Sequence, residues 1–322
     1  MLVLGESDVE ELLDPAGCTE AMADAFRTLA RGEVHQTLRQ IIRPPGEGSL
    51  IGLMPVFRGG DRPLYGLKTV CVVPSNAQRG LDPHQGTVSL FDGRTGQTIA
   101  VMNAAPITAI RTAACSAVAT RALARDGART LAVIGTGHQA HAHLRVLPAV
   151  LPFERVIVAG RDPAKIQALS REVGGEPASS IEEGVHEADV VVTATSSPEP
   201  VLRVDWLRPG AHVNAVGACF PHTRELDGQT MAASAVFVDR RESAEGESGA
   251  YLLAVEEGAI EPDHIRAELG EVLLGDAPGR SSQDEITVFE SLGLAVEDLF
   301  AAEYLVERAR ALGRGTSVEF NA

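Results

Sequence analysis

Residues 130–140 read TLAVIGTGHQA. A short apolar run, Leu131–Ile134, ends at Gly135, and residues able to begin a helix follow Gly137, so that the spacing is G-x-G-x-x-A. Gly135 permits a tight turn, Gly137 lets a pyrophosphate approach the backbone, and Ala140 is small enough for a helix to pack on its strand. The phosphates would then lie at a helix N-terminus. The pattern therefore predicts dinucleotide binding; the alternative is an ordinary glycine turn in an α/β protein.

Strands and helices alternate on the C-terminal side of this turn. Apolar runs predict strands at 130–135, 155–159, 189–194, 212–216 and 235–239, with helices at 138–147, 163–173, 180–187 and 225–233. Short loops joining parallel strands through helices are typical of a doubly wound sheet. Ile286–Phe289 is β-like, and the acidic stretch Glu242–Arg280 gives no clear pattern.

The N-terminal part has a different organisation. A capping box predicts a helix over Ser7–Leu13, and a second helix over Thr19–Arg31 is expected with Thr19 as its cap. Strands are predicted at 37–43, 50–57, 64–73, 87–91 and 98–102, which makes an α+β unit. A long helix over Pro106–Ala124 leads into the second domain, and a last helix, Leu294–Leu312, is expected to return to the first.

We therefore predict an α/β protein of two domains. A substrate-binding and dimerisation domain spans 1–115 and is completed by 294–322; an NAD(P)-binding Rossmann domain spans 116–293.

Composition excludes several classes of partner. The formal charge of −16 disfavours nucleic acid and anionic membranes, and no apolar run approaches the ~20 residues of a membrane span. Met1–Glu10 lacks the pattern of a signal peptide, so we expect a cytoplasmic protein. The four cysteines have no CxxC spacing and no HExxH is present, so we expect no metal; His141 and His143 are expected to be exposed on a helix.

In a chain this acidic, cations on apolar faces are informative. Lys68 shares a predicted strand face with Leu64 and Val70, where an ammonium is costly unless an anion meets it. The alternative is an edge strand with this lysine in solvent.

Arg111 lies on the predicted long helix among small apolar residues, so its guanidinium needs a carboxylate. That carboxylate belongs either to a ligand or to an internal salt bridge. Arg39 and Arg43 fall on one face of the strand predicted over 37–43, and either can complete a cationic cluster; a solvated strand face explains them equally well.

The end of the second predicted Rossmann strand bears on the type of cofactor. An acidic residue usually binds the ribose 2′-OH of NAD there, but here Gly160 and Arg161 come first. A cation in place of a carboxylate favours the 2′-phosphate of NADP(H). The alternative is that Asp162 turns inward and the cofactor is NAD(H). Thr195 and Ser196 end one later strand, and Asn214–Cys219 ends the next, so both segments are candidates for the nicotinamide ribose and the reacting centre.

The chain resembles the ornithine cyclodeaminase/mu-crystallin family over nearly its full length. The matching segments are Leu53-Met-Pro, Gly66-Leu-Lys68, Ile107-Thr-Ala-Ile-Arg111-Thr-Ala-Ala, Ile134-Gly-Thr-Gly-His-Gln139, Asn214-Ala-Val-Gly217, Arg224-Glu-Leu226, Val288-Phe-Glu-Ser-Leu-Gly293 and Ala295-Val-Glu-Asp298. The resemblance implies a homodimer made through the N-terminal domain and an active site between the two domains. It also implies that Arg39, Lys68 and Arg111 hold a substrate carboxylate, with Arg43 as the alternative to Arg39.

One departure bears on the reaction. Members that cyclise ornithine carry an aspartate shortly after the Asn-Ala-Val-Gly strand, and this chain has Cys219 there. A thiol is a poor general base near neutral pH. The resemblance then points to the mu-crystallin branch and its bacterial relatives, which look like reductases of cyclic ketimine carboxylates and tend to use NADPH.

The leading hypothesis is an NAD(P)H-dependent reductase of a cyclic imino acid, such as 1-pyrroline-2-carboxylate or 1-piperideine-2-carboxylate. Lys68, Arg111 and Arg39 are its expected catalytic and substrate-binding residues, with Cys219 also at the substrate. The expected cofactor contacts are Thr108, Gly135, Thr136, Gly137, His138, Gln139, Gly160, Arg161, Thr195, Ser196, Val216 and Gly217. The alternatives are an ornithine cyclodeaminase, a related amino-acid or opine dehydrogenase, and a non-catalytic NADPH-binding protein.

Overall fold

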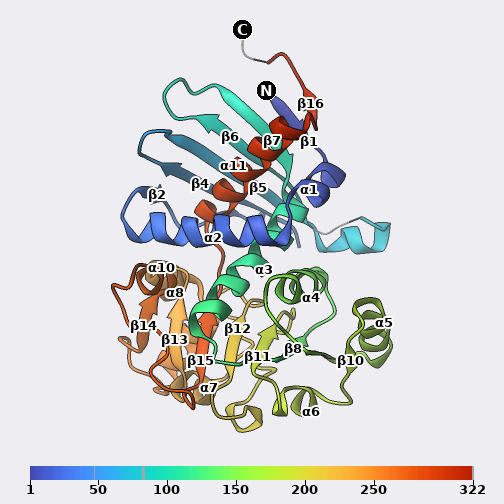
Figure 1. The fold of residues 1–322 in the computed structure, drawn as a ribbon, viewed down its shortest axis with the longest axis vertical. Helices are drawn as coiled ribbons and strands as arrows, with labels where there is room; N and C mark the ends of the chain where they lie inside the picture. The colour runs from blue at the N-terminus through green and yellow to red at the C-terminus, as the bar shows by residue number, and fades with distance from the viewer. Residues whose placement is uncertain (47, 82–83, 321–322) are drawn as a thin grey trace. The chain divides into compact units, whose positions relative to one another are not determined.

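The fold is that of a computed structural model, which describes residues 1–46, 48–81 and 84–320 (Figure 1). The chain divides into two compact units. Unit 1 comprises Met1–Arg111 together with the chain from Leu294 onward, and unit 2 comprises Thr112–Gly293. No helix within the described ranges is long and apolar enough to span a membrane.

Unit 1 is an α+β unit. Its elements are β1 (Leu2–Leu4), α1 (Glu6–Leu12), α2 (Pro15–Ala30), β2 (Val34–Gln36), β3 (Gln40–Ile42), β4 (Leu50–Arg58), β5 (Leu64–Val72), the 3-10 helix η1 (Pro74–Arg79), β6 (His84–Asp92), β7 (Thr98–Asn103), the start of α3 (Ala104–Leu123), α11 (Ala295–Leu312) and β16 (Thr316–Ser317). The strand order is β16-β1-β7-β6-β5-β4-β2, with β3 also paired to β4. The long strands β4 to β7 form an antiparallel meander.

Side-chain capping places the first two helices earlier than the sequence analysis predicted. The Gly5 N–H donates to the Asp8 carboxylate at 3.0 Å, so α1 begins at Glu6 and the predicted Ser7 cap is wrong. Asp14 caps α2 by accepting from the Gly17 N–H at 2.8 Å. Thr19 lies inside that helix and donates to a backbone carbonyl one turn earlier. An aspartate carboxylate therefore takes the capping role in both helices.

The sheet of unit 1 buries one face against helices. Lys68 lies on β5 between Met54 of β4 and Val88 of β6, so it belongs to an interior strand, and the edge-strand interpretation is wrong. The same face approaches α11, since a Cβ on Gly66 would lie 3.2 Å from the Leu299 side chain. Figure 1 shows α11 running across these strands. The Lys68 side chain is therefore enclosed between the sheet and α11.

The strand predicted over 37–43 is wrong in extent. Only Gln40–Ile42 forms β3; Arg39 precedes it and Arg43 follows it. The two arginines therefore do not share a face of one regular strand. Arg39 is half-buried and Arg43 is exposed.

Unit 2 is a doubly wound α/β domain. Its elements after α3 are β8 (Thr130–Ile134), α4 (His138–Val150), β9 (Arg155–Ala159), α5 (Pro163–Val173), β10 (Glu176–Pro177), α6 (Ile181–His186), β11 (Val190–Thr193), the 3-10 helix η2 (Val204–Trp206), β12 (His212–Ala215), α7 (Gly228–Ala232), β13 (Ala235–Val238), α8 (Arg241–Glu247), α9 (Gly249–Glu256), β14 (Ile265–Glu268), α10 (Leu269–Leu274) and β15 (Thr287–Glu290). The strands are parallel, in the order β10-β9-β8-β11-β12-β15-β13-β14.

This order creates a switch point at β8. The chain passes from β8 to β9 on one side and later returns to place β11 on the other. Ligands of open α/β sheets bind outside the carboxyl ends of the strands at such a point. The turn that begins at Gly135 follows β8 directly and therefore lies at this edge.

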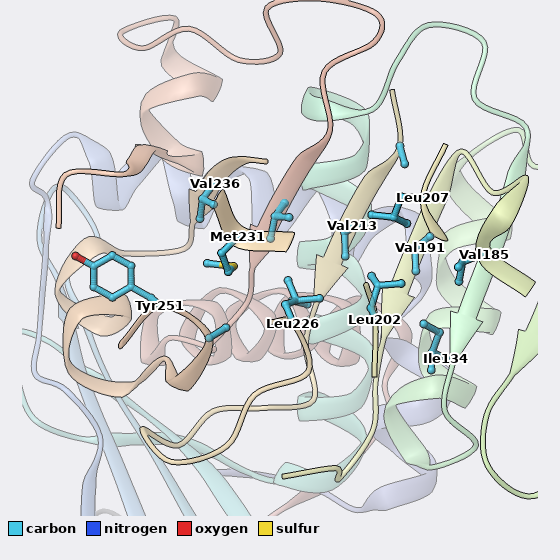
Figure 2. Close-up of a cluster of buried hydrophobic side chains, with 14 of the residues drawn as sticks. Ile134, Val185, Val191, Leu202, Leu207, Val213, Leu226, Met231, Val236 and Tyr251 are labelled. Atoms are coloured by element: carbon cyan, nitrogen blue, oxygen red, sulfur yellow. The ribbon is translucent and has the colours of Figure 1, made fainter. Parts of the chain in front are cut away.

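A large apolar cluster covers one face of the sheet (Figure 2). Alternate strand residues such as Ile134, Val191, Val213 and Val236 supply its sheet side. Helices α6, α7 and α9 cover it, the last through the buried Tyr251. The central strands are buried on both faces, which explains why they read as continuous apolar runs in the sequence.

One histidine differs from the prediction. His141 is exposed, as expected, but His143 is fully buried on α4. The Gln139 carbonyl can only accept, so Nδ1 of His143 donates to it at 2.7 Å, and Nε2 accepts from the Ser116 hydroxyl at 2.9 Å. Burial lowers the pKa of His143 to about 4, which keeps this ring neutral.

Candidate active site

The glycine turn after β8 has the geometry of a phosphate-binding turn. Gly135 has φ +132°, and a Cβ there would lie 2.3 Å from the Ala194 carbonyl oxygen, so only glycine fits. Gly137 begins α4 with no side-chain cap, and a Cβ on it would meet nothing within 4 Å. The start of α4 is therefore open on the side of Gly137, and a helix N-terminus is a favourable place for a pyrophosphate. Thr136, His138 and Gln139 lie in the same turn, half-buried or exposed.

Arg161 and Asp162 follow the end of β9, and the structure shows which of the two side chains is available to a cofactor. Asp162 caps α5, since its Oδ1 accepts from the N–H groups of Ala164 and Lys165 at 3.0 and 3.2 Å. Its carboxylate is thus committed to the helix. Arg161 is exposed beside Gly160, which lies close to the Gly135 backbone.

The ends of β11 and β12 form two corners that touch each other. A Cβ on Gly217 would lie 2.2 Å from the Thr195 carbonyl oxygen, so this position also requires glycine. The Val216 N–H donates to the Thr193 carbonyl at 3.0 Å. Ser196, which follows Thr195 in the first corner, is exposed to solvent. The predicted contacts on these two corners therefore lie together at the carboxyl edge of unit 2.

Glu225 joins these corners and was not singled out from the sequence. It is 1% exposed, and its carboxylate accepts from the N–H groups of Thr195 and Gly217 and from the Thr193 hydroxyl. The only available signal was its place in the segment Arg224-Glu-Leu226. Cys219 lies beyond Gly217, half-buried against the apolar cluster.

Unit 1 contains a buried cluster of four charges. Arg111 donates through Nη1 to Glu297 Oε2 at 2.5 Å and through Nε to Asp298 Oδ1 at 3.1 Å. The Lys68 ammonium lies 2.7 Å from Asp298 Oδ2. All four side chains are at most 5% exposed. Lys68 and Arg111, predicted separately, are thus brought together by one carboxylate.

The internal salt bridge left open for Arg111 is present. Its partners, Glu297 and Asp298, begin α11, 186 and 187 residues further along the chain. The sequence pattern gave no indication of this pairing, because an acidic residue in the first turn of a helix is ordinarily solvated and favourable for the helix dipole. Neither residue was among the predicted site residues.

Burial shifts the pKa values of two members of this cluster, Lys68 and Glu297. Burial lowers the pKa of Lys68 to about 8, against the opposing charge of Asp298. Burial raises the pKa of Glu297, although the Arg111 guanidinium works in the other direction. Oε1 of Glu297 has no hydrogen-bond partner among the described residues. A proton on Glu297 would leave the four charges with a net charge of +1.

Two further predicted residues belong to unit 1. Arg39 lies in the segment between β2 and β3, and Thr108 lies on α3 one turn before Arg111, half-buried.

Comparison with known proteins identifies the family. The model of the ornithine cyclodeaminase/mu-crystallin family matches residues 1–313. The chain belongs to this family. It is 37% identical over 327 residues to a Delta(1)-pyrroline-2-carboxylate reductase of Bacillus cereus, covering 99% of this chain and 100% of the relative. It is 38% identical over 290 residues to the ketimine reductase mu-crystallin of Mus musculus, covering 89% of this chain and 90% of that protein.

A solved member of the family has the same fold. The Delta(1)-pyrroline-2-carboxylate reductase of Thermococcus litoralis, solved in complex with NADH and L-proline, is 35% identical and superposes with a TM-score of 0.93. The match covers 99% of this chain and 100% of that chain. The predicted family and the predicted α/β fold class are confirmed.

Proposed function

We propose that this protein is an oxidoreductase that reduces a cyclic imino acid to the corresponding L-amino acid with NAD(P)H. The substrate is of the 1-pyrroline-2-carboxylate or 1-piperideine-2-carboxylate type. The nicotinamide cofactor supplies a hydride to the C=N carbon, and the imine nitrogen takes up a proton. The named reductases that match this chain over nearly its full length support this activity.

The observation that carries the proposal is the buried pair of cations in unit 1. A buried ammonium and guanidinium are costly unless an anion compensates each of them. Asp298 is the only partner that the described residues provide for the Lys68 ammonium, so its other N–H donors are left for a ligand. The substrate carboxylate binds to Lys68 and Arg111, with Arg39 as the third cation. Uptake of a proton by Glu297 balances the added negative charge.

These residues act mainly by orientation. A carboxylate held by a planar guanidinium and an ammonium has one preferred orientation. This orientation fixes the position of the C=N carbon of the substrate ring, which must face the nicotinamide. The proton for the imine nitrogen comes from Lys68 or from a water molecule. A pKa near 8 makes the Lys68 ammonium a competent acid close to neutral pH.

The cofactor binds to unit 2 and is preferentially NADP(H). The turn at Gly135 and Gly137 holds the pyrophosphate, and Arg161 meets the 2′-phosphate because Asp162 is committed to α5. Exposed ion pairs contribute at most about 1 kcal/mol. Arg161→Ala should therefore raise the Kd of NADPH no more than about five-fold, leave that of NADH unchanged and lose its effect in 0.5 M salt. Equal changes for both cofactors would contradict the assignment.

The protein acts as a homodimer through unit 1. The sheet face opposite α11 carries half-buried Leu53, Phe57 and Leu67, and Tyr65 is 47% exposed. The rings of Phe57 and Tyr65 lie 4.7 Å apart. An apolar face of this kind marks an interaction site. Light scattering should give twice the chain mass for the wild type and the single mass for Leu67→Asp; a monomeric wild type would contradict the dimer.

The reaction itself is tested by a substrate panel. Purified protein is mixed with NADPH or NADH and with pyrroline-2-carboxylate, piperideine-2-carboxylate, or pyruvate and ammonia, and the absorbance of the reduced cofactor is followed. In a separate arm, ornithine is mixed with NAD+ or NADP+, and both the released ammonia and the reduced cofactor are measured. We expect rapid oxidation with a cyclic imino acid and the faster rate with NADPH. If the protein oxidises the cofactor with pyruvate and ammonia but not with the cyclic imino acids, it is an amino-acid dehydrogenase. Ammonia release from ornithine without net cofactor turnover would indicate a cyclodeaminase, in spite of Cys219.

A further inference from the structure

Glu225 connects the ends of two neighbouring strands. Its Oε2 accepts from the Thr193 hydroxyl at 2.8 Å and from the Gly217 N–H at 2.6 Å, and its Oε1 accepts from the Thr195 N–H at 2.7 Å. Thr193 is the last residue of β11, and Gly217 follows the end of β12 by two residues. The backbone carbonyl of Glu225 also accepts from Val201 and Leu202. One residue thus fixes both corners.

No cation compensates this buried carboxylate within the part of the chain that the structure describes; all of its partners are neutral donors. The Thr193 hydroxyl can donate or accept, but the two backbone N–H groups can only donate, so Glu225 faces mainly donors. Burial raises the pKa of the Glu225 carboxyl, and the hydrogen bonds from Thr195, Thr193 and Gly217 offset part of this rise. The hydrogen-bond donors around Glu225 thus favour its ionised form, against the effect of burial.

Glu290 lies beside Glu225 and has the opposite environment. It ends β15, is 2% exposed and accepts one hydrogen bond, from the Ser248 hydroxyl at 3.0 Å. Its Oε2 has no partner among the described residues, and the space that it shares with Glu225 has no room for a water molecule. Burial raises the pKa of Glu290 to about 8, and the charges of Glu225 and Asp239 add to this shift.

These carboxylates do not form a cation site. In the described part of the chain, no group of acidic, histidine or cysteine side chains is placed to hold a metal ion. Asp239 is committed to the N–H groups of Leu292 and Gly293 at 2.8 and 2.7 Å. The three acids therefore have structural partners, and Glu225 alone connects segments expected to contact a ligand.

We propose that Glu225 is a positioning residue for the nicotinamide end of the cofactor, and that Glu290 is kept protonated so that Glu225 remains the single charge of the pair. Glu225 does not touch the cofactor. It sets the spacing of Thr195 and Gly217, the corners expected to line the nicotinamide ribose. This inference rests on the proposed function for the place of the cofactor, and it deepens that function.

The first experiment compares Glu225→Gln with a matched control. A glutamine places an NH2 group against donors that need an acceptor, so at least one corner must move. Calorimetry should show a Kd for NADPH at least ten-fold above that of the wild type, while the KM for the imine at saturating cofactor changes less than three-fold. Glu257→Gln removes the neighbouring ion pair with Arg224 on the surface and should leave both values unchanged. An NADPH Kd within two-fold of the wild type, or an equal rise in both constants, would overturn the proposal.

The second experiment does not depend on the stability of the first variant. Glu290→Gln has the shape of the protonated acid, so it is expected to fold. In the wild type, Glu290 loses its proton as the pH rises through about 8, beside Glu225 and Asp239. The Kd for NADPH should then rise at least three-fold between pH 7 and pH 9 in the wild type and stay constant in Glu290→Gln. The same pH dependence in both proteins would overturn the proposal.

Failure of this inference is distinguishable from failure of the proposed function. Both experiments read cofactor binding, which calorimetry measures without any substrate. A wild type that binds NADPH but turns over no cyclic imine would contradict the proposed activity and leave the effect of Glu225 measurable. A wild type that binds no nicotinamide cofactor would overturn the inference as well.

Discussion

Both units contain buried carboxylates, but the negative charge is compensated by cations in unit 1 and by neutral hydrogen-bond donors in unit 2. In unit 1, Glu297 and Asp298 are compensated by two cations, Lys68 and Arg111. In unit 2, Glu225 is compensated by neutral hydrogen-bond donors, two of which are backbone N–H groups. Both groups of side chains are almost completely buried.

The difference indicates which group can exchange partners. A backbone N–H is fixed by its strand, so a carboxylate that it holds works as a brace. A lysine ammonium carries three N–H donors on a flexible side chain and can bind a second carboxylate without rearrangement of the backbone. The cluster of unit 1 is therefore suited to bind an acidic ligand, and the carboxylate of unit 2 is suited to hold a framework.

The largest effect is expected from Arg111→Met. It removes the guanidinium that compensates the buried Glu297 and Asp298 carboxylates, and breaking a buried ion pair typically costs about 3–5 kcal/mol. Urea unfolding should show this loss in unit 1, and cofactor oxidation with the imine should be abolished. Arg111→Lys keeps the charge and should lose less stability. A loss below about 1 kcal/mol for Arg111→Met would show that the cluster is solvated.

Lys68→Met should affect activity more than folding. Asp298 keeps its bond to Arg111, but the ligand carboxylate loses a buried cation. Such a loss costs about 2–5 kcal/mol, or about 30-fold to several-thousand-fold in kcat/KM for the imine. The chain has one other lysine, the exposed Lys165, and Lys165→Met is the matched control at saturating cofactor. Equal kcat/KM values for the two variants would remove Lys68 from the substrate site.

Thr193→Val tests the brace of unit 2 with a nearly isosteric change. It removes one neutral donor and leaves Glu225 with two backbone N–H groups. Hydrogen bonds to charged groups contribute about 1.5–3 kcal/mol, so the loss of stability should be smaller than for Arg111→Met. Urea unfolding of both variants gives the comparison. If Thr193→Val lowers the free energy of unfolding by more than Arg111→Met does, the buried carboxylate of unit 2 contributes more to stability than the cluster of unit 1, contrary to this expectation.

The pH dependence of product binding should be the smallest of these effects. Below about pH 8 Lys68 is protonated and attracts a carboxylate; as the pH rises through about 8 this attraction is lost. The inhibition constant of L-proline should thus rise about ten-fold per pH unit above this point. In Lys68→Met the dependence near pH 8 should be absent; if it persists, another group titrates.

Much of the secondary structure could be predicted because local sequence patterns determine it. The strand at 155–159 and the helix at 163–173 were placed at their observed bounds, since each has a strong period and clear ends. The order of the strands is less accessible. β15 lies between β12 and β13 although it follows both in sequence, and β14 falls in the acidic stretch that showed no pattern. Strand order depends on contacts between distant segments, which a local period does not encode.

The candidate site divides in the same way. Lys68 and Arg111 were recognisable because a cation on an apolar face is unusual. Glu297, Asp298 and Glu225 were not, because a carboxylate near a helix start looks solvated until its distant partner is known. The strand predicted over 37–43 shows the opposite error: the sequence suggested one strand of seven residues, while only Gln40–Ile42 pairs with β4.

The most direct test of the account removes the carboxylate from the substrate and leaves the protein unchanged. Cofactor oxidation by the wild type is measured with pyrroline-2-carboxylate and with 1-pyrroline, which has the same ring and C=N bond. If Lys68 and Arg111 bind the carboxylate, kcat/KM for 1-pyrroline should be lower by at least about 100-fold. Values within three-fold of each other would contradict the claim that the buried cations of unit 1 bind the substrate.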